Sequence, residues 1–310
     1  MILSYVAYRV LLYIPTLLAI FFIVFSLVKL LPGDPIIVMY GELAPPPEVR
    51  KALEEKLGLD KPFIIQFLLY TYRILTGDWG KSVHTGEPVL ELVIRRFTAT
   101  LELTVASLAI ASATGITLAY IAVMRPNSIV DRFIGVLSMA GYSMPVFWWG
   151  MILIFVFAVN LKLLPPGGRG GLESLILPSL TLATVNFGMI ARVSRAAMLE
   201  VYSQDFVMAA RSRGLSERRV VVLYVMRNAA VAIATLVGLR FGILMGGAVI
   251  TETVFNYPGV GRMIVDGITA RDYPVVFGGV VFVALVVMTV NLVVDLLYAI
   301  LDPRARVTRV

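Results

Sequence analysis

The stretch VVFGGVVFVALVVMTVNLVVDLLYAI at residues 275–300 carries a single charged side chain, Asp295. A helix needs about 20 mostly apolar residues to cross the hydrocarbon core of a bilayer, so this stretch predicts a membrane-spanning helix. Five other runs meet the same criterion, at 10–31, 100–124, 133–159, 175–193 and 229–251. We therefore expect an all-α membrane protein with six transmembrane helices, each formed by one continuous run.

The composition agrees with lipid as the main solvent. Hydrophobic residues make up 59% and charged residues 15% of the 310 positions, whereas a soluble domain has about 45–50% and about 25%. The chain has no cysteine and one histidine, His84, which excludes disulfides, thiolate chemistry and histidine-cluster metal sites. No spacing of carboxylates or of serine and histidine suggests catalysis. We expect no enzymatic activity, no cofactor and no metal.

The formal charge of +7 lies largely on short loops between the apolar runs. Loops 125–132 and 192–228 and the C-terminal tail are rich in arginine, and the short loops on the opposite side are poorer in basic residues. Basic residues in short loops mark the cytoplasmic side of a membrane protein. This distribution predicts a multi-pass protein of the cell membrane with both termini in the cytoplasm, and no nucleic-acid partner.

Residues 32–98 are the only polar stretch long enough to fold outside the bilayer. Pro47 occupies a favoured first helical position, and Gly58 follows a run with helical periodicity as a stop signal. A second, largely apolar helix is expected over 62–77. This extracellular helical region either caps the ends of the spanning helices or contacts a docking protein or substrate. The expected division is an N-terminus with the first span at 1–31, this region at 32–98, and a five-helix core at 99–310.

The segment 203–226, between the fourth and fifth runs, has the punctuation of a folded element. Ser203 or Asp205 can cap a first helix, and Gly214 can end it in a left-handed turn. Ser216 can cap a second helix, and Glu217 favours its positive N-terminus. The segment therefore predicts a short helix, a glycine elbow and another helix on the cytoplasmic surface.

The side chains of this elbow predict contact with another protein. Ala209 and Ala210 are small enough to let a second surface approach closely, and Arg211 and Arg213 can pair with acidic groups on it. Arg218 and Arg219 add to the positive charge around Gly214. Because the segment is joined covalently to two spans, it can transmit a partner's movement into the membrane. A basic loop that serves only membrane orientation would not need this punctuation.

The sequence Met-Ala-Ala-Arg-Ser-Arg-Gly at 208–214 resembles the cytoplasmic EAA loop of ABC importer permeases, with Ala209, Ala210 and Gly214 at matching positions. Met208 stands where that pattern usually has glutamate, and Arg227 and Asn228 stand where many families have Leu-Pro. Motifs along nearly the whole chain are similar to the dipeptide/oligopeptide branch in the same order, among them Leu-Pro-Gly-Asp-Pro at 31–35, Gly-Asp-Trp-Gly-Lys-Ser at 77–82, Tyr-Pro-Gly-Val-Gly at 257–261 and Leu-Asp-Pro-Arg at 301–304.

This resemblance implies the fold of a type I importer permease, with a coupling helix at about 203–216 that fits a groove on a cytoplasmic ATPase. The implied coupling residues are Asp205, Ala209, Ala210, Arg211, Arg213, Gly214 and Glu217. The implied partners are a second homologous permease, two ATPase subunits, an extracellular substrate-binding protein and the lipid bilayer. The chain contains no G-x-x-x-x-G-K-[ST] phosphate loop, so ATP hydrolysis by that route is expected on the ATPase subunits.

Two features inside the fifth run bear on the translocation path. Gly238, Gly242 and Gly246 recur every four residues and predict either close helix packing or room for substrate. Arg240 lies roughly opposite this glycine face, and a charge in mid-span must face protein or water rather than lipid. It can line the path and attract a carboxylate such as a peptide C-terminus, or form a buried pair with Glu102, Glu252 or Asp295. Both interpretations stay open at this point.

The substrate class also stays open. Peptides are the first expectation from the resemblance, with oligosaccharides and nickel chelates as alternatives within the same class of transporter. A different class is a secondary transporter driven by protons or sodium, which typically has ionisable groups at mid-span and broken helices. The few ionisable groups and the unbroken apolar runs argue against that class.

Overall fold

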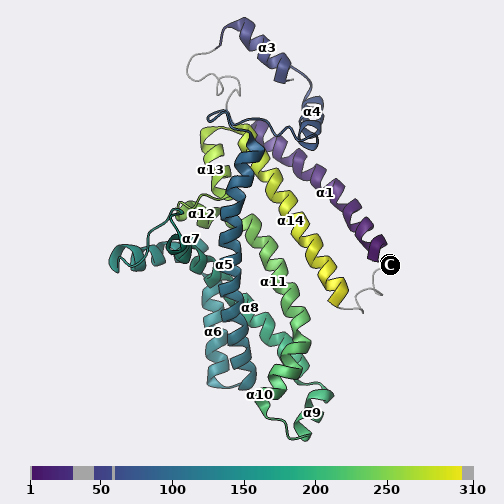
Figure 1. The fold of residues 1–310 in the computed structure, drawn as a ribbon, viewed down its shortest axis with the longest axis vertical. Helices are drawn as coiled ribbons and strands as arrows, with labels where there is room; N and C mark the ends of the chain where they lie inside the picture. The colour runs from purple at the N-terminus through teal and green to yellow at the C-terminus, as the bar shows by residue number, and fades with distance from the viewer. Residues whose placement is uncertain (1, 31–44, 58–59, 302–310) are drawn as a thin grey trace. The chain divides into compact units, whose positions relative to one another are not determined.

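The computed structural model describes residues 2–30, 45–57 and 60–301. Its described part is helical and contains no β-strand, only an isolated bridge between Lys81 and Pro88 (Figure 1). Several predictions lie outside these residues: the motif at 31–35, the stop at Gly58 and the arginines of the C-terminal tail. The chain divides into two compact units, one made of Met1–Thr100 with Pro258–Val286 and the other of Leu101–Tyr257 with Val287–Val310.

The first unit is built around an aromatic core. It contains α1 (Ile2–Leu30), α3 (Pro47–Leu57), α4 (Phe63–Leu75), the start of α5 (Val89–Met124), α13 (Val260–Ala270) and the start of α14 (Tyr273–Leu301). Phe25 of α1, Tyr70 of α4 and Phe277 of α14 pack against one another, with the centroids of the last two rings 4.5 Å apart. The predicted helix starting at Pro47 and the predicted helix within 62–77 are both confirmed.

Residues 77–88 are tied to the turn between α13 and α14. The carboxylate of Asp272, which is 3% exposed, accepts hydrogen bonds from the Ser82 hydroxyl at 2.6 Å and from the Val83 amide at 3.0 Å. Nε2 of His84 lies 2.7 Å from the carbonyl oxygen of Ala270. A buried carboxylate therefore fixes a loop to a turn about 190 residues further along the chain.

The second unit contains the rest of α5 together with α6 (Ile129–Ser143), α7 (Val146–Leu153), α8 (Leu172–Tyr202), α9 (Asp205–Ser212), α10 (Glu217–Val220), α11 (Arg227–Gly247), α12 (Val249–Val254) and the end of α14. Two π-helical segments, η1 (Ile154–Asn160) and η2 (Val221–Met226), continue α7 and α10. Glycines set the closest helix contacts. A Cβ atom at Gly188 of α8 would lie 2.1 Å from the carbonyl oxygen of Ser138 in α6, so only glycine allows this approach.

Four helical stretches are long and apolar enough to cross a membrane: α5, α8, Glu217–Gly246 and α14. A fifth span forms if the bent pair Ile129–Ser143 and Val146–Asn160 crosses once. In α1 the segment Leu11–Leu27 is apolar but shorter. The chain is thus a membrane protein with several spanning helices.

The prediction of a continuous helix over 133–159 is wrong. The two halves of this run are bent by 98° at Met144 and Pro145. Met144 has an extended backbone (φ −93°, ψ 139°), since the ring of a following proline disfavours helical geometry in the residue before it. Pro145 lies directly before Val146, the first residue of α7, where its missing N–H is not needed.

The glycine face of α11 packs against α14. A Cβ atom at Gly238 would lie 2.7 Å from Cγ2 of Val294, and one at Gly242 would lie 3.1 Å from Oδ1 of Asn291. Gly246 is exposed. For Gly238 and Gly242 the structure therefore agrees with close helix packing rather than with room for substrate.

Candidate functional site

The segment after α8 folds as the predicted helix, glycine turn and second helix. α9 ends at Ser212, Gly214 has φ +80°, and α10 begins at Glu217. The Gly214 amide donates to the carbonyl of Arg211 at 2.8 Å, which closes the turn. A left-handed backbone of this kind is strained for any residue with a Cβ atom, which explains glycine here.

The predicted cap of α9 is wrong, and that of α10 is correct in position only. Gln204 occupies the position before α9, and its side chain makes no capping hydrogen bond. The Ser203 hydroxyl donates to the carbonyl of Glu200 instead, and Asp205 lies inside the first turn of α9. There its negative charge still favours the helix N-terminus. Ser216 does occupy the position before α10, but its side chain makes no capping hydrogen bond.

Arg211 joins the two sides of the turn. Its Nε and Nη2 atoms donate to the carboxylate of Glu217 at 3.2 and 2.9 Å, and its guanidinium lies 4.1 Å from the ring centroid of Tyr202. The hydrogen bond to Glu217 raises the pKa of Arg211, so the pair stays charged. Arg211 is thus engaged within the chain, and its pairing with acidic groups of a partner stays a prediction.

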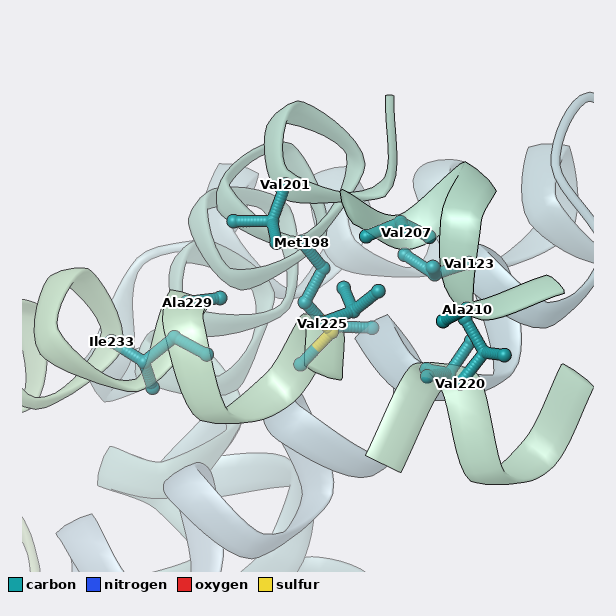
Figure 2. Packing of buried hydrophobic residues seen from close by; sticks show 11 residues of the cluster. Val123, Met198, Val201, Val207, Ala210, Val220, Val225, Ala229 and Ile233 are labelled. Carbon is teal, nitrogen blue, oxygen red and sulfur yellow. The ribbon is translucent and has the colours of Figure 1, made fainter. Parts of the chain in front are cut away.

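A buried cluster anchors α9 to the membrane-crossing helices. Val207 and Ala210 of α9 are 0% and 3% exposed. Figure 2 shows their side chains in one cluster with residues from α5, α8, α10 and α11. The other members of the cluster are Ala119, Val123, Met198, Val201, Val220, Val221, Val225, Ala229 and Ile233. A displacement of α9 therefore acts on apolar packing shared with α5, α8 and α11.

The opposite face of α9 is open. Ala209 is exposed, and Phe206 and Met208 are 40% and 63% exposed. The remaining exposed residues near this face are Asp205, Ser212 and Arg213. The prediction that both alanines face outward is wrong for Ala210, since the three-residue spacing from Val207 puts it on the anchored face. Val207 was not singled out from the sequence, although its spacing from Ala210 was the available signal.

Arg213, Arg218 and Arg219 are exposed, and within the described part of the chain they form no ion pair. These guanidinium groups surround the Gly214 turn. The elbow thus combines an exposed apolar and small-residue surface with unpaired positive charge. Such a surface suits an acidic, partly apolar protein partner.

Arg240 of α11 is half-buried. Among residues 2–30, 45–57 and 60–301 it forms no ion pair, so the alternative of a pair with Glu102, Glu252 or Asp295 is not formed in this structure. Glu102 instead accepts a hydrogen bond from Arg169 at 2.6 Å and one from the Tyr257 hydroxyl at 3.4 Å.

Comparison with known protein families identifies the family to which this chain belongs. Residues 111–307 match the family described as binding-protein-dependent transport system inner membrane component, and residues 2–104 match its N-terminal family. The chain belongs to this family. It is therefore a permease subunit of a binding-protein-dependent ABC importer, a multi-pass membrane protein that works with a substrate-binding protein and an ATPase.

Similar proteins cover the permease along its whole length. The di/tripeptide transport system permease protein of Pseudomonas aeruginosa is 40% identical over 332 residues, covering 98% of this chain and 99% of that protein. The dipeptide transport system permease protein of Escherichia coli strain K12 is 38% identical over 335 residues with the same coverage. The glutathione transport system permease protein of Salmonella typhimurium strain LT2 is 40% identical over 304 residues, again covering 98% and 99%.

A solved structure shares the fold. The crystal structure of an amino acid ABC transporter with histidines matches with a TM-score of 0.52 and 17% sequence identity, covering 69% of the permease and 94% of that chain. At this identity the match supports the fold alone.

Proposed function

We propose that this permease forms half of the translocation path for di- and oligopeptides in an ATP-driven importer. It works with a second homologous permease, two cytoplasmic ATPase subunits that carry the hydrolysis, and an extracellular substrate-binding protein. The observation that carries this proposal is the anchoring of α9, which has one face in a cluster shared with α5, α8 and α11 and the other face exposed.

Coupling follows from that geometry. The exposed face of α9, with Ala209 at its centre and Arg213 at its end, enters a groove on the ATPase. Asp205 favours the start of α9, the Arg211–Glu217 pair and Gly214 hold the elbow in shape, and Val207 and Ala210 transmit its movement. ATP binding closes the two ATPases and tips the bundle from inward-open to outward-open, the binding protein releases its substrate, and hydrolysis resets the bundle.

The proposed topology has six spans, with α1 as the first and the bent pair of α6 and α7 with η1 as the third. Both termini lie in the cytoplasm, as the arginine-rich loops favour. Residues 32–98, which include α3 and α4, form an extracellular insertion between the N-terminal span at 1–31 and the core at 99–310. The α13 region and the loop tied to Asp272 then face the binding protein.

Peptides are the proposed cargo because the similar permeases are named for dipeptides, di/tripeptides and glutathione. Arg240 is the proposed contact for a peptide carboxylate, since an unpaired guanidinium at mid-span is costly unless it faces water or an anion. Gly246, which is exposed on the same helix, completes the proposed path lining, whereas Gly242 is buried and sets the distance to α14. Arg240→Gln should lower peptide uptake and peptide-stimulated ATP hydrolysis, and Arg240→Lys should retain more of both.

A single-cysteine experiment tests the coupling assignment. Because the chain has no cysteine, Ala209→Cys places one thiol on the exposed face of α9. A membrane-impermeant maleimide should label it from the cytoplasmic side in the permease, and bound ATPase subunits should protect it. Leu172→Cys, at a position 83% exposed at the other end of α8, should react from outside and stay unprotected. If the thiol introduced on α9 is labelled from outside, or if the ATPases leave its labelling unchanged, the assignment is refuted.

A second experiment tests the cargo and the energy source. The native complex is purified with its binding protein, and the bound solute is identified by mass spectrometry. A bound peptide supports the proposed cargo. A bound oligosaccharide or nickel chelate would show that this solute, and not a peptide, is the cargo. Uptake by proteoliposomes that contain the permease without ATPase subunits would instead indicate an ion-driven secondary transporter.

A further inference from the structure

A cavity of about 320 Å³ lies between α6 and α8, away from the elbow and from Arg240. Its lining includes three arginines, Arg132, Arg192 and Arg195, and one acidic residue, Asp131. A volume of this size is within the range of small-molecule sites, roughly 300–1,000 Å³. None of these residues is assigned a role in coupling or in the translocation path.

The acidic residue of the cavity is neutralised inside the protein. Asp131 is 6% exposed, and its two carboxylate oxygens accept hydrogen bonds from Arg195, each at 2.6 Å. The amide of Asn127 donates to the same carboxylate at 2.9 Å. Asp131 is buried and Arg195 is 32% exposed, and their ion pair lines the cavity without adding net charge to it.

The other two arginines leave the cavity positively charged. Arg132 and Arg192 are exposed, and within the described ranges neither forms an ion pair. They come from different helices and converge on one space. Two guanidinium groups that line one space can together donate hydrogen bonds to the oxygen atoms of a phosphate group.

Arg192 lies where the apolar part of α8 ends. Residues 174–191 of this helix carry no charged side chain, a length of about 27 Å, and Arg192 is the first charged residue after them. Tyr202, the end of α8, follows ten residues later, and α9 begins at Asp205. The cavity therefore lies at the end of the apolar part of α8 that is next to the elbow, where the headgroups of surrounding lipids are expected.

An open apolar groove leads from the charged end of the cavity. Arg132, Gly135 and Met139 follow one another at helical spacing on α6, and all three line the cavity. A Cβ atom at Gly135 would meet nothing within 4 Å, and Met139 is 58% exposed. The groove beside Gly135 is thus unfilled by the protein.

We propose that this cavity is a binding site for an anionic phospholipid, with the headgroup phosphate between Arg132 and Arg192 and one acyl chain along Gly135 and Met139. A soluble phosphate ester shares the headgroup chemistry but would make no use of the groove. Basic pockets between helices on the cytoplasmic side are a recurring form of lipid recognition. The inference depends on the membrane location of the permease and not on the identity of its cargo.

The test uses the assembled transporter in nanodiscs of phosphatidylcholine, with phosphatidylglycerol titrated in and binding followed by native mass spectrometry. Each removed guanidinium should weaken phosphatidylglycerol binding about fivefold, so Arg132→Gln with Arg192→Gln should weaken it about 25-fold. Arg125→Gln is the matched control, because Arg125 is an exposed arginine four residues before α6 that does not line the cavity. Unchanged binding in the double variant would overturn the proposal.

Gly135→Leu separates lipid from free phosphate and leaves every charge in place. This variant should fill the groove and weaken phosphatidylglycerol binding, and the open space around Gly135 makes it compatible with folding. Inorganic phosphate and glycerol phosphate, added as competitors, should displace little of the bound lipid. If they displace it fully, or if Gly135→Leu binds phosphatidylglycerol like the unmodified protein, the site recognises a soluble anion and the lipid proposal fails.

Discussion

Arg211 donates two hydrogen bonds to the carboxylate of Glu217 across the left-handed turn at Gly214, at 3.2 and 2.9 Å. The two residues lie six positions apart, so no regular helix would bring them together, and their contact defines the angle between α9 and α10. Both side chains are about one-third exposed, at 34% and 38%. The pair therefore acts as an orienting contact with a modest contribution to stability.

Glu217→Gln should loosen the elbow without unfolding the permease. Exposed or half-exposed ion pairs contribute up to about 1 kcal/mol, which corresponds to about fivefold faster amide exchange if local opening limits the exchange. Hydrogen–deuterium exchange of the peptide that contains α9 measures this effect. Glu200→Gln is the control, since Glu200 is an exposed acid on α8 away from the turn, and its exchange pattern should match that of the unmodified permease. Equal exchange in both variants would show that the pair does not hold the elbow.

Gly214→Ala should uncouple ATP hydrolysis from transport more than Gly214→Asn does. A Cβ atom at this position meets no neighbouring atom within 4 Å, so strain in the φ +80° backbone is the only penalty. This conformation costs an alanine roughly 1–2 kcal/mol, and asparagine tolerates it better. The ratio of peptide taken up to ATP hydrolysed in proteoliposomes is the measurement. An alanine variant that is coupled as well as the asparagine variant would contradict the importance of the turn.

The sequence predicts the helical elements well where hydrophobic runs and turn residues decide them, as for Pro47–Leu57 and the Gly214 turn. The sequence does not predict the bend at Pro145. Pro15 and Pro178 lie inside α1 and α8 without breaking them, so a proline in an apolar run does not by itself predict a 98° bend. The extended backbone of Met144 produces the bend, and the local sequence does not distinguish Pro145 from the two prolines that lie inside helices.

For the candidate site, the local sequence predicts the elbow but not which side of α9 faces the bundle. Ala209 and Ala210 are adjacent and chemically identical, yet one is exposed and the other is 3% exposed. The difference comes from Val123 of α5, which is distant in sequence, and Met198 of α8, which lies in another helix; both meet α9 only in the fold. The Arg211–Glu217 pair was also not predicted. Its six-residue spacing does not bring two side chains together on one helix, and only the turn between α9 and α10 does so.

The two alanines of α9 give a matched pair of variants. Ala210→Arg places a charge in the buried cluster with Val207 and Val220, so it should destabilise the elbow by several kcal/mol unless the charge escapes to water. Ala209→Arg should leave the cluster intact and block docking of the ATPase. Limited proteolysis near α9 reports the first effect and co-purification of the ATPase subunits the second. Increased cleavage of the Ala209→Arg variant would mean that the inner and outer faces have been misassigned.

Asp272→Asn should detach the loop at residues 77–88 from the turn that precedes α14. Hydrogen bonds to a charged group contribute about 1.5–3 kcal/mol to stability, and Asp272 accepts short ones from Ser82 and Val83. The thermal midpoint of the purified permease should fall, and amide exchange at Val83 should rise. Asp266→Asn is the control, since Asp266 is an exposed residue of α13 whose ion pair with Arg262 at 3.5 Å contributes little, so both quantities should stay nearly unchanged. If both aspartate variants behave alike, the buried carboxylate does not fix the loop.

Gly238→Ala should destabilise the contact between α11 and α14, and a second substitution should restore it. The added Cβ atom would lie 2.7 Å from Cγ2 of Val294, a buried and branched side chain that has little freedom to move. Overpacking of this kind costs about 1–3 kcal/mol. In the double variant Gly238→Ala with Val294→Ala the clash is gone, so thermal unfolding in detergent should show a favourable interaction between the two changes. Additive effects of the two single variants would mean that Gly238 does not pack against Val294, and the glycine repeat of α11 would then need another explanation.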